Sequence, residues 1–542
     1  MAGREQPLGR AVIMPGVRGR TALLLMWGLV AVAIAVVAIP PASGGGAGSP
    51  TRVAGAGVRS LSARGPRLSP PAAVPLATGW RYAPDPGNVG LRNHWESAAG
   101  TRLGWAPVTI PNDFNPTVAG ASDRPAVGWY EVSFTGPPVT PGRSWSVSFE
   151  SVRRNAQVWL NGTEIGSSSD PYAPFALPAR TLRPGATNIL VVRVDTFEGA
   201  GSLPEDWWNW GGIMGPVTLQ GVGRVSAQGL GVMPELGCAN RCGDLLVEAT
   251  LRSHSAGALR PELLVSATSP DGVTSTSVRA AGALPAGSAR QVRFRVPVRG
   301  PLALWSPASP SLYRVQVQVL DGRSVEQVDA LRVGLRSVRV RGGILYLNGS
   351  RLWLHGAAIQ EDVQGRGAAL TDSDIETIVS ELRSVGANVT RAHYLLSPRL
   401  LDALDQAGIM VWEQPPVDHA DPALASAAGR ARALALLRST LVGDRSHPSV
   451  LIDSIGNELS PTPDTTPGTR AYIDQASALA RALDPGVPVA LDTYCYPGFP
   501  AQRSYSKLDV LGISAYFGWY TGPPGHSIAD FDGLAPFLRL TH

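Results

Sequence analysis

The segment Val450-Leu-Ile-Asp-Ser-Ile-Gly-Asn-Glu458 decides the fold, because it joins an apolar run to an acidic group between two helical stretches. The apolar residues at its start are typical of a strand that is buried on both faces. Helical patterns precede it over 423–442 and follow it over 470–483. A buried strand between two helices is the unit from which parallel α/β sheets are built.

The same unit repeats through the last part of the chain. The pattern predicts strands over 353–358, 388–393, 409–413, 450–455, 487–493 and 510–516, and helices over 373–385, 398–406, 423–442 and 470–483. Such alternation indicates a β/α barrel or a doubly wound sheet. A complete barrel takes ~250 residues. Residues 343–542 provide fewer, and we expect about six strands from them.

Upstream of this region the pattern changes to short segments that alternate with period two. Over 78–224 these segments are broken by turns, among them Asn161-Gly162, a pair favoured in tight hairpins. A second series of alternating strands covers 225–342, a length that suits an immunoglobulin-like sandwich. We therefore predict two β-sandwiches ahead of the β/α region.

The N-terminus has the features of an export signal. Residues 1–20 contain four arginines and precede an uncharged apolar run within 21–39. Positive charge before an apolar segment keeps that end inside and sends the rest outside. Segment 21–39 is expected to be a signal peptide or a membrane anchor. Residues 40–77 read as a Gly/Ser/Pro-rich linker, so the domains would be extracellular or held at the membrane surface.

Composition narrows the chemistry further. The formal charge is +5, but only Lys507 is a lysine, and no dense basic run occurs beyond the N-terminus. A nucleic-acid partner is therefore not expected. The three cysteines form no CxxC pair, which disfavours a zinc or redox site. Cys238 and Cys242 could close a small disulfide in an exported chain, leaving Cys495 free.

Ionisable residues collect where the predicted parallel strands end. These residues are Glu361, Asp362, Arg391, His393, Glu413, Glu458 and Tyr516. A single acid at a strand end is most often a salt-bridged structural residue. Agreement among several strand ends instead favours a catalytic site, because β/α barrels place their catalytic groups at the carboxyl ends of the strands.

Several motifs carry a resemblance to a known family. They are Leu347-Asn-Gly-Ser-Arg-Leu-Trp-Leu-His-Gly356 with Gln360-Glu-Asp362, Gly386-Ala-Asn-Val-Thr-Arg-Ala-His-Tyr394, Ser454-Ile-Gly-Asn-Glu458, Val158-Trp-Leu-Asn-Gly162 and Trp208-Asn-Trp-Gly-Gly-Ile213. In these stretches the chain resembles glycoside hydrolase family 2, which includes β-galactosidases, β-glucuronidases and β-mannosidases. The resemblance covers about 78–542. It implies a jelly-roll sugar-binding-like domain, an immunoglobulin-like domain and a TIM barrel.

The resemblance also implies roles for individual residues. Glu458 corresponds to the general acid/base, whose pKa would have to be raised near neutrality. Asn457 corresponds to the residue that hydrogen-bonds the sugar 2-hydroxyl. The remaining substrate-binding candidates are Arg391, His393, Glu361, Asp362, Glu413, Tyr516 and Trp519, with structural ion pairing as the alternative for the three acids. The acid/base chemistry requires no metal or cofactor, and the family allows a homo-oligomer.

Two positions depart from the family pattern. Ser514 stands where glucuronidase-like members carry Asn, and Asp453 replaces the usual Trp. Both concern the details of the sugar subsite. The segments 365–367 and 516–520 favour a glucuronidase-like branch over a galactosidase-like one.

A retaining mechanism needs a second carboxylate roughly 5 Å from the acid/base. The family carries it as a Glu at the end of a seventh strand, but no Glu follows Glu458 in this sequence. We therefore expect a retaining exo-β-glycosidase that lacks its nucleophile-bearing part here. The alternatives are a non-catalytic surface carbohydrate-binding protein, an enzyme completed by a second chain, and a structural adhesin. The adhesin leaves the β/α region unexplained.

Overall fold

The computed structural model describes residues 73–97, 105–115, 125–197, 203, 209–494, 501–517 and 531–541. The predicted basic segment 1–20, the predicted signal or anchor 21–39, most of the predicted linker and Trp519 lie outside these residues. Strand β1 (Val74–Pro75) falls within the last part of the predicted linker and pairs with β13. In the described part of the chain, no helix is both long and apolar enough to span a bilayer.

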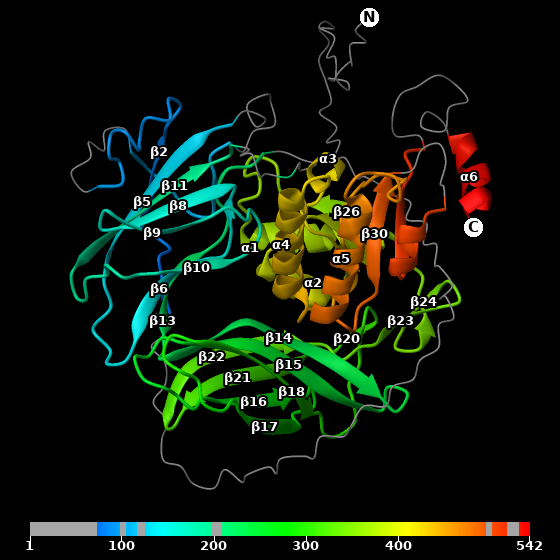
Figure 1. Ribbon diagram of the computed structural model, residues 1–542, viewed down its shortest axis with the longest axis horizontal. Helices are drawn as coiled ribbons and strands as arrows, with labels where there is room; N and C mark the ends of the chain where they lie inside the picture. Colours follow the sequence, from blue (N-terminus) through cyan, green and yellow to red (C-terminus); the bar gives the residue numbers. More distant parts are fainter. Residues whose placement is uncertain are drawn as a thin grey trace, which may run out of the picture.

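The first region is an antiparallel β-sandwich (Figure 1). One sheet contains β1, β13 (Val217–Val222), β6 (Ser144–Phe149) and β10 (Phe175–Pro178). The other contains β3 (Ala106–Pro107), β2 (Arg81–Pro84), β5 (Val127–Thr135), β11 (Thr187–Asp195), β8 (Asn155–Leu160) and β9 (Thr163–Ser168). A small sheet contains β4 (Asn112–Asp113), β12 (Gly212–Ile213) and β7 (Val152–Arg153). Alternate side chains of both large sheets form one core, which includes Tyr130, Phe149 and Val192.

A second antiparallel sandwich follows. Its sheets contain β14 (Val225–Gly237), β15 (Cys242–Ser253) and β18 (Ala289–Pro297) on one side, and β17 (Thr274–Ala280), β16 (Glu262–Thr268), β21 (Tyr313–Asp321) and β22 (Ser324–Val333) on the other. The chain forms the short strands β19 (Trp305–Ser306) and β20 (Ser309–Pro310) between β18 and β21. After β22, the short strands β23 (Val338–Arg341), β24 (Ile344–Leu347) and β25 (Ser350–Arg351) lead to the last region.

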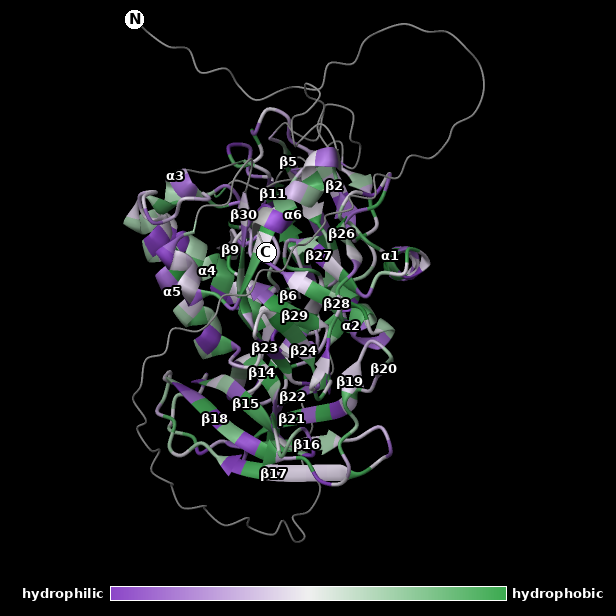
Figure 2. Ribbon diagram, turned by 90° about the vertical axis from the view of Figure 1, so that its right-hand side faces the viewer, coloured by the Kyte–Doolittle hydropathy of each residue, from purple (hydrophilic) through white to green (hydrophobic). Residues whose placement is uncertain are grey.

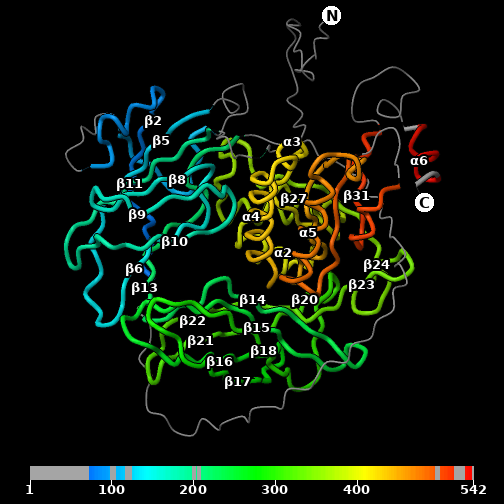
Figure 3. The backbone as a smooth tube through the Cα atoms, viewed as in Figure 1, coloured from blue at the N-terminus to red at the C-terminus, as the bar shows by residue number. Residues whose placement is uncertain are grey.

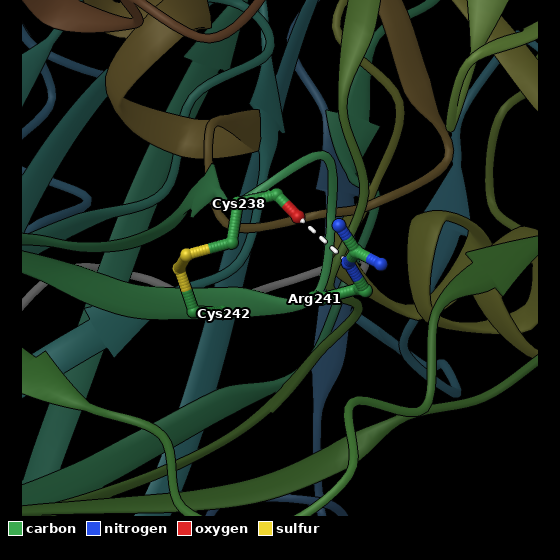
Figure 4. Close-up of a disulfide and its surroundings, with 3 residues drawn as sticks. All are labelled: Cys238, Arg241 and Cys242. Carbon is green, nitrogen blue, oxygen red and sulfur yellow. Dashed lines mark hydrogen bonds between the residues drawn. A yellow bond between two sulfur atoms is a disulfide. The ribbon is translucent and has the colours of Figure 1, made fainter.

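The hairpin between β14 and β15 is closed by a disulfide between Cys238 and Cys242 (Figure 4). The two Cα atoms are 5.4 Å apart, and Arg241 Nε donates to the Cys238 carbonyl at 3.2 Å. Cys238, Ala239 and Asn240 all have left-handed backbone, at φ 52°, 52° and 66°. The disulfide therefore stabilises a turn that non-glycine residues rarely adopt.

The last region is a six-stranded parallel sheet with helices between its strands. The strands are β26 (Gly356–Gln360), β27 (Val389–His393), β28 (Met410–Glu413), β29 (Val450–Ser454), β30 (Val489–Tyr494) and β31 (Val510–Ser514), in this spatial order. The helices are α1 (Asp372–Ser384), α2 (Pro398–Ala407), α3 (Asp421–Leu424), α4 (Ala427–Asp444), α5 (Thr469–Leu483), η1 (Arg503–Lys507), η2 (Phe531–Gly533) and α6 (Leu534–Thr541). The predicted fold class, two sandwiches followed by an incomplete β/α barrel, is confirmed.

Helices α4 and α5 cover one side of this sheet (Figure 1). Their apolar faces join β30 in one core through Leu437, Ile473 and Leu491. Figure 2 shows hydrophobic colouring on β28 and β29, as expected for strands buried on both faces. The prediction of one long helix over 423–442 is wrong in one respect. The segment forms two helices, α3 and α4, because the Ser426 side chain accepts from Gly429 N at 2.9 Å and caps the start of α4.

The second sandwich packs against the base of the parallel sheet, and the tube in Figure 3 traces the chain from one to the other. Arg445, at the end of α4, donates to Glu248 Oε2 at 3.1 Å and to the Gly229 carbonyl at 2.5 Å. Val232 N donates to Ser446 Oγ at 3.0 Å. Buried polar contacts therefore hold these two regions together.

Candidate active site

The candidate catalytic residues lie at the carboxyl ends of the parallel strands. Arg391 and His393 belong to the end of β27, and Asn457 and Glu458 directly follow β29. Tyr516 follows β31. Because neighbouring parallel strands end at the same edge, residues more than 100 positions apart in sequence meet here.

The segment after β28 runs alongside the segment that carries Glu458. Asn457 N donates to the Val417 carbonyl at 2.8 Å, and His419 N donates to the Asn457 carbonyl at 3.1 Å. The Asn457 side-chain amide also donates to Asp418. Both His419 and Glu458 have left-handed backbone, at φ 41° and 46°. These bonds set the direction in which the two side chains leave the backbone.

Glu458 is buried and accepts hydrogen bonds at both carboxylate oxygens. His419 Nε2 lies 2.9 Å from Oε2, and the Tyr516 hydroxyl donates to Oε1. Burial opposes ionisation, but these bonds, a side-chain bond with Ser514 and the nearby imidazole outweigh it, so the pKa of Glu458 is lowered. The expectation of a raised pKa is wrong for this arrangement, because donors stabilise the carboxylate.

Arg391 and Asn457 form the floor beside Glu458. Arg391 Nη2 donates to the side-chain oxygen Oδ1 of Asn457. Arg391 Nε lies 3.8 Å from Asp492 Oδ1. Asp492 in turn accepts from Trp412 Nε1 at 3.0 Å and from Ser454 Oγ at 2.6 Å. Burial raises the pKa of Asp492, while the guanidinium of Arg391 opposes this shift. The network brings two of the predicted residues, Arg391 and Asn457, into direct contact.

His393 is nine-tenths buried beside this floor. Among the described residues, neither ring nitrogen has a hydrogen-bond partner. Burial, together with the nearby Arg391 cation, holds the pKa of His393 well below its usual value. The imidazole is therefore neutral near pH 7, with one donor and one acceptor available to a polar ligand.

Glu361 and Asp362 connect this end of the sheet to the first sandwich. Glu361 accepts from Ser397 N at 3.0 Å and lies 3.6 Å from Arg153 Nη2 of β7. Trp210 Nε1 donates to Asp362 at 3.1 Å. Burial raises the pKa of Glu361, and Arg153 opposes the shift. Both acids of the parallel-sheet region therefore have partners in the first sandwich, Arg153 for Glu361 and Trp210 for Asp362.

Glu413 lies on the other face of the sheet. Val411, two residues earlier, packs in the core formed with α1 and α2, and side chains alternate along a strand. Glu413 is therefore directed towards the helices, beside Asp453 of β29. Burial, then Glu361 and Asp453, raises the pKa of Glu413 well above its usual value. The structure does not bring Glu413 into the group around Glu458.

Asp453, which replaces the family's Trp, belongs to this helix-facing acidic group. Asp453 is 1% exposed, and its charged neighbours are Asp484, Asp444 and Arg336. Burial first, then Asp484 and Asp444, raises its pKa well above the usual value. The substitution therefore affects packing behind the sheet.

Sequence reasoning missed His419, Asp492, Gln414 and Tyr494. Gln414 is fully buried, and no described residue hydrogen-bonds its side-chain amide. The Tyr494 ring lies 6.4 Å from His419 and 6.0 Å from Tyr516. Asp492 could have been found as an acid at the end of a predicted strand. His419 lies in a loop, where no periodicity indicates its direction.

A metal-like cluster of Asp402, Asp405 and His447 is found elsewhere, at the other end of the sheet from Glu458. Asp405 accepts from Ser449 N at 2.9 Å and lies 2.7 Å from His447 Nδ1. Both Asp405 oxygens are therefore engaged within the protein. We interpret the cluster as a structural ion pair at the base of the sheet.

Comparison with known proteins identifies the family. The sequence family described as "Glycosyl hydrolases family 2, TIM barrel domain" matches residues 338–528, and "Glycosyl hydrolases family 2" matches 235–336. Together these matches cover more than half of the chain.

Relatives of known name agree with this. A beta-glucuronidase of Paenibacillus borealis is 25% identical over 483 residues, which are 82% of this chain and 76% of that protein. A putative beta-glucuronidase of Formosa agariphila is 26% identical over 431 residues, 77% of this chain. The chain spans only 50% of that protein, and 37% of a Photobacterium profundum beta-galactosidase that is 26% identical.

Solved structures share the fold. The Bacteroides uniformis beta-glucuronidase aligns with a TM-score of 0.74 at 20% identity, over 87% of this chain and 57% of that one. A putative beta-galactosidase of Bacteroides fragilis aligns with a TM-score of 0.72 at 22% identity, over 83% and 68%. With its two sandwiches, its parallel β/α sheet and these sequence matches, the chain belongs to glycoside hydrolase family 2.

Proposed function

We propose that this chain is the acid/base-bearing part of a retaining exo-β-glycosidase that hydrolyses O-glycosyl bonds of glucuronide- or galactoside-type β-glycosides. The observation that carries the proposal is the contact group of Glu458, Asn457 and Arg391 at the carboxyl ends of the parallel strands. The beta-glucuronidases and beta-galactosidases among the relatives support the substrate class.

In the proposed reaction Glu458 acts twice. It first donates a proton to the glycosidic oxygen as the bond from that oxygen to C1 breaks, and it later removes a proton from the attacking water. Asn457 binds the sugar 2-hydroxyl with the amide hydrogen that is not engaged by Asp418. Arg391 keeps the Asn457 amide oriented, and neutral His393 offers a further polar contact.

The proposal assigns the nucleophile to a glutamate on a further strand, in sequence not included in these 542 residues. Two facts support this assignment. No glutamate follows Glu458 in the printed sequence. Among the described residues, β31 has no parallel neighbour beyond it.

We also propose that the protein is exported, either secreted or held at the outer face of a membrane. The basic segment followed by an apolar run at 21–39 supports export. The disulfide between Cys238 and Cys242 supports it independently, because such bonds persist in oxidising compartments.

The test uses a small external nucleophile with the chain as printed. Sodium azide takes the place of the missing carboxylate and attacks C1 of an aryl β-glycoside while Glu458 protonates the departing aryl oxygen. The expected products are the phenol and the α-glycosyl azide. We expect azide-dependent phenol release with a nitrophenyl β-glucuronide or β-galactoside, lowered about 100-fold in Glu458→Ala.

A matched chain extended with its following coding sequence should hydrolyse the same substrates without azide. Binding of the sugar with no turnover in either chain would contradict the proposal and favour the carbohydrate-binding alternative. Glu381→Ala, on the exposed side of α1, controls for the loss of a carboxylate.

A further inference from the structure

The hydrogen bonds to the Glu458 carboxylate favour its ionised form, whereas its proposed role as a general acid needs the protonated form. A general acid must carry a proton and present it to the glycosidic oxygen. Here Oε1 accepts from the Tyr516 hydroxyl, and Oε2 lies 2.9 Å from His419 Nε2. Ser514 adds a third side-chain bond, and a carboxylate held by such donors is stabilised as the anion. One of these donors must therefore leave before Glu458 can act as an acid.

His419 is the donor that can leave. Its side chain is 52% exposed, whereas that of Glu458 is 9% exposed. The His419 backbone stays bonded to the Asn457 carbonyl at 3.1 Å, so the ring can turn without moving the loop. The Tyr494 ring, with its centroid 6.4 Å from the imidazole, provides a neighbouring aromatic surface.

The other charged and titratable groups around Glu458 are fixed by partners of their own. Asp492 of β30 is bonded to Trp412 and Ser454, and Arg391 of β27 donates to Asn457. Asp418 accepts from Asn457. The effect of these groups on the ionisation of Glu458 therefore stays constant, whereas the contact with His419 can form and break.

We propose that His419 is a positioning residue that keeps Glu458 ionised in the free protein and is displaced from Oε2 by the glycosidic oxygen of the substrate. Displacement removes one donor to the anion, and Glu458 then takes one proton from solvent. That proton passes to the glycosidic oxygen as its bond to C1 breaks, and His419 forms no covalent bond. The proposal rests on the acid/base role proposed for Glu458.

The first test measures the ionisation of Glu458 directly and needs no turnover. A water-soluble carbodiimide with an amine labels protonated carboxyl groups, and mass spectrometry gives the labelling of Glu458 against pH in the 542-residue chain. We expect the midpoint to rise by about one pH unit in His419→Phe, which keeps a ring but has no donor. His419→Gln, which restores a donor near the Nε2 position, should return the midpoint towards that of the unsubstituted chain.

A second histidine offers a matched control. His94 also has left-handed backbone, at φ 52°, and lies 3.0 Å from Glu96. It belongs to the first sandwich, so His94→Phe should leave the Glu458 midpoint unchanged. An unchanged midpoint in His419→Phe would overturn the proposal.

The second test uses the azide-dependent reaction. The pH profile of kcat/KM reports the free protein, and that of kcat reports the complex. In His419→Phe the alkaline limb of kcat/KM should move up by about one pH unit, with the kcat limb unchanged, because the ring is already displaced in the complex. Equal movement of both limbs would overturn displacement. Absence of turnover in the unsubstituted chain would count against the proposed function alone, and the labelling midpoints would then decide the role of His419.

Discussion

At the scale of single residues, the direction of a side chain matters more than its position in sequence. Asp492 and Glu413 are both acids at strand ends, yet only Asp492 contacts the floor beside Glu458. Asp492 accepts from the buried Trp412 indole and lies against Gly512, where an added Cβ would be 2.0 Å from Oδ1. Any side chain at position 512 would therefore push Asp492 away from Arg391.

Replacing Asp492 with alanine should lower the free energy of unfolding by about 2 kcal/mol, because the buried indole N–H of Trp412 loses its acceptor. Denaturant unfolding followed by tryptophan fluorescence measures this loss. Arg295→Ala, which breaks an exposed ion pair with Glu235, serves as the control and should cost less than about 1 kcal/mol. Equal losses in both variants would contradict the assignment of Asp492 to a buried network.

At the scale of elements, the parallel strands carry different chemistry on their two faces. One face leads to Arg391, His393 and Asp492, and the other carries Glu413 and Asp453 towards the helices. A register shift between Val411 and Trp412 places Glu413 beside Asp453. The helix-facing group therefore concentrates buried carboxyls that the proposed reaction does not use.

Asp453→Asn should make the protein more stable at neutral and alkaline pH. The pKa of Asp453 is raised in the folded state. The contribution of its protonated carboxyl to folding stability is therefore fully present below the unfolded pKa and is lost as pH rises through the folded pKa. The neutral amide keeps the shape of the side chain and removes this pH-dependent loss of stability.

Thermal unfolding between pH 4 and pH 8 tests this expectation. The midpoint temperature of Asp453→Asn should fall less towards pH 8 than that of the unsubstituted chain. Asp474→Asn, at an exposed position of α5, should give a curve parallel to the unsubstituted one. Parallel curves for both variants would contradict the prediction, because they would show that the pKa of Asp453 is the same in the folded and unfolded states.

At the scale of the whole molecule, buried polar contacts couple the sandwiches to the parallel sheet. Glu248 of the second sandwich has two arginine partners, Arg445 at 3.1 Å and Arg293 at 2.8 Å. The Arg445 side chain is 4% exposed, and that of Arg293 is 50% exposed. Mutation of each arginine in turn therefore compares the stability contribution of a buried ion pair with that of a surface ion pair at the same carboxylate.

Arg445→Ala should lower the free energy of unfolding by about 3 kcal/mol, because it leaves Glu248 and the Gly229 carbonyl without a buried donor. Arg293→Ala should cost no more than about 1 kcal/mol. Calorimetry should also resolve separate transitions for the second sandwich and the parallel sheet in Arg445→Ala. A single transition with equal losses in both variants would contradict coupling through Arg445.

The disulfide hairpin is a second whole-molecule feature, because Asn240 accepts from Ser337 Oγ at 3.0 Å just before β23. Serine at both Cys238 and Cys242 should lower the stability by about 2 kcal/mol, as expected for a short closed loop. Unfolding with and without a reducing agent measures the effect. The serine variant should be insensitive to reductant, and equal reductant sensitivity would show that the bond does not form in solution.

Much of this architecture could be predicted from the sequence. The six parallel strands lie within a few residues of their predicted positions, because buried apolar runs between helical patterns are strong local signals. The break at Ser426 was missed, since a capping side chain competes with a continuous helical pattern only through local hydrogen bonds. The sequence also could not predict that Asp453 joins a buried acidic group behind the sheet, because this depends on which helix ends approach β29.

By itself the sequence determined the fold class, the strand that leads to Glu458 and the resemblance to the family, because periodicity and motifs are properties of neighbouring residues. Tertiary structure alone decided which groups surround Glu458. His419 and Tyr516 come from two other loops, 39 residues before it and 58 after it, and together they lower its pKa. The ionisation of a carboxyl depends on burial and on donors within a few ångströms, and folding brings those together from distant parts of the chain.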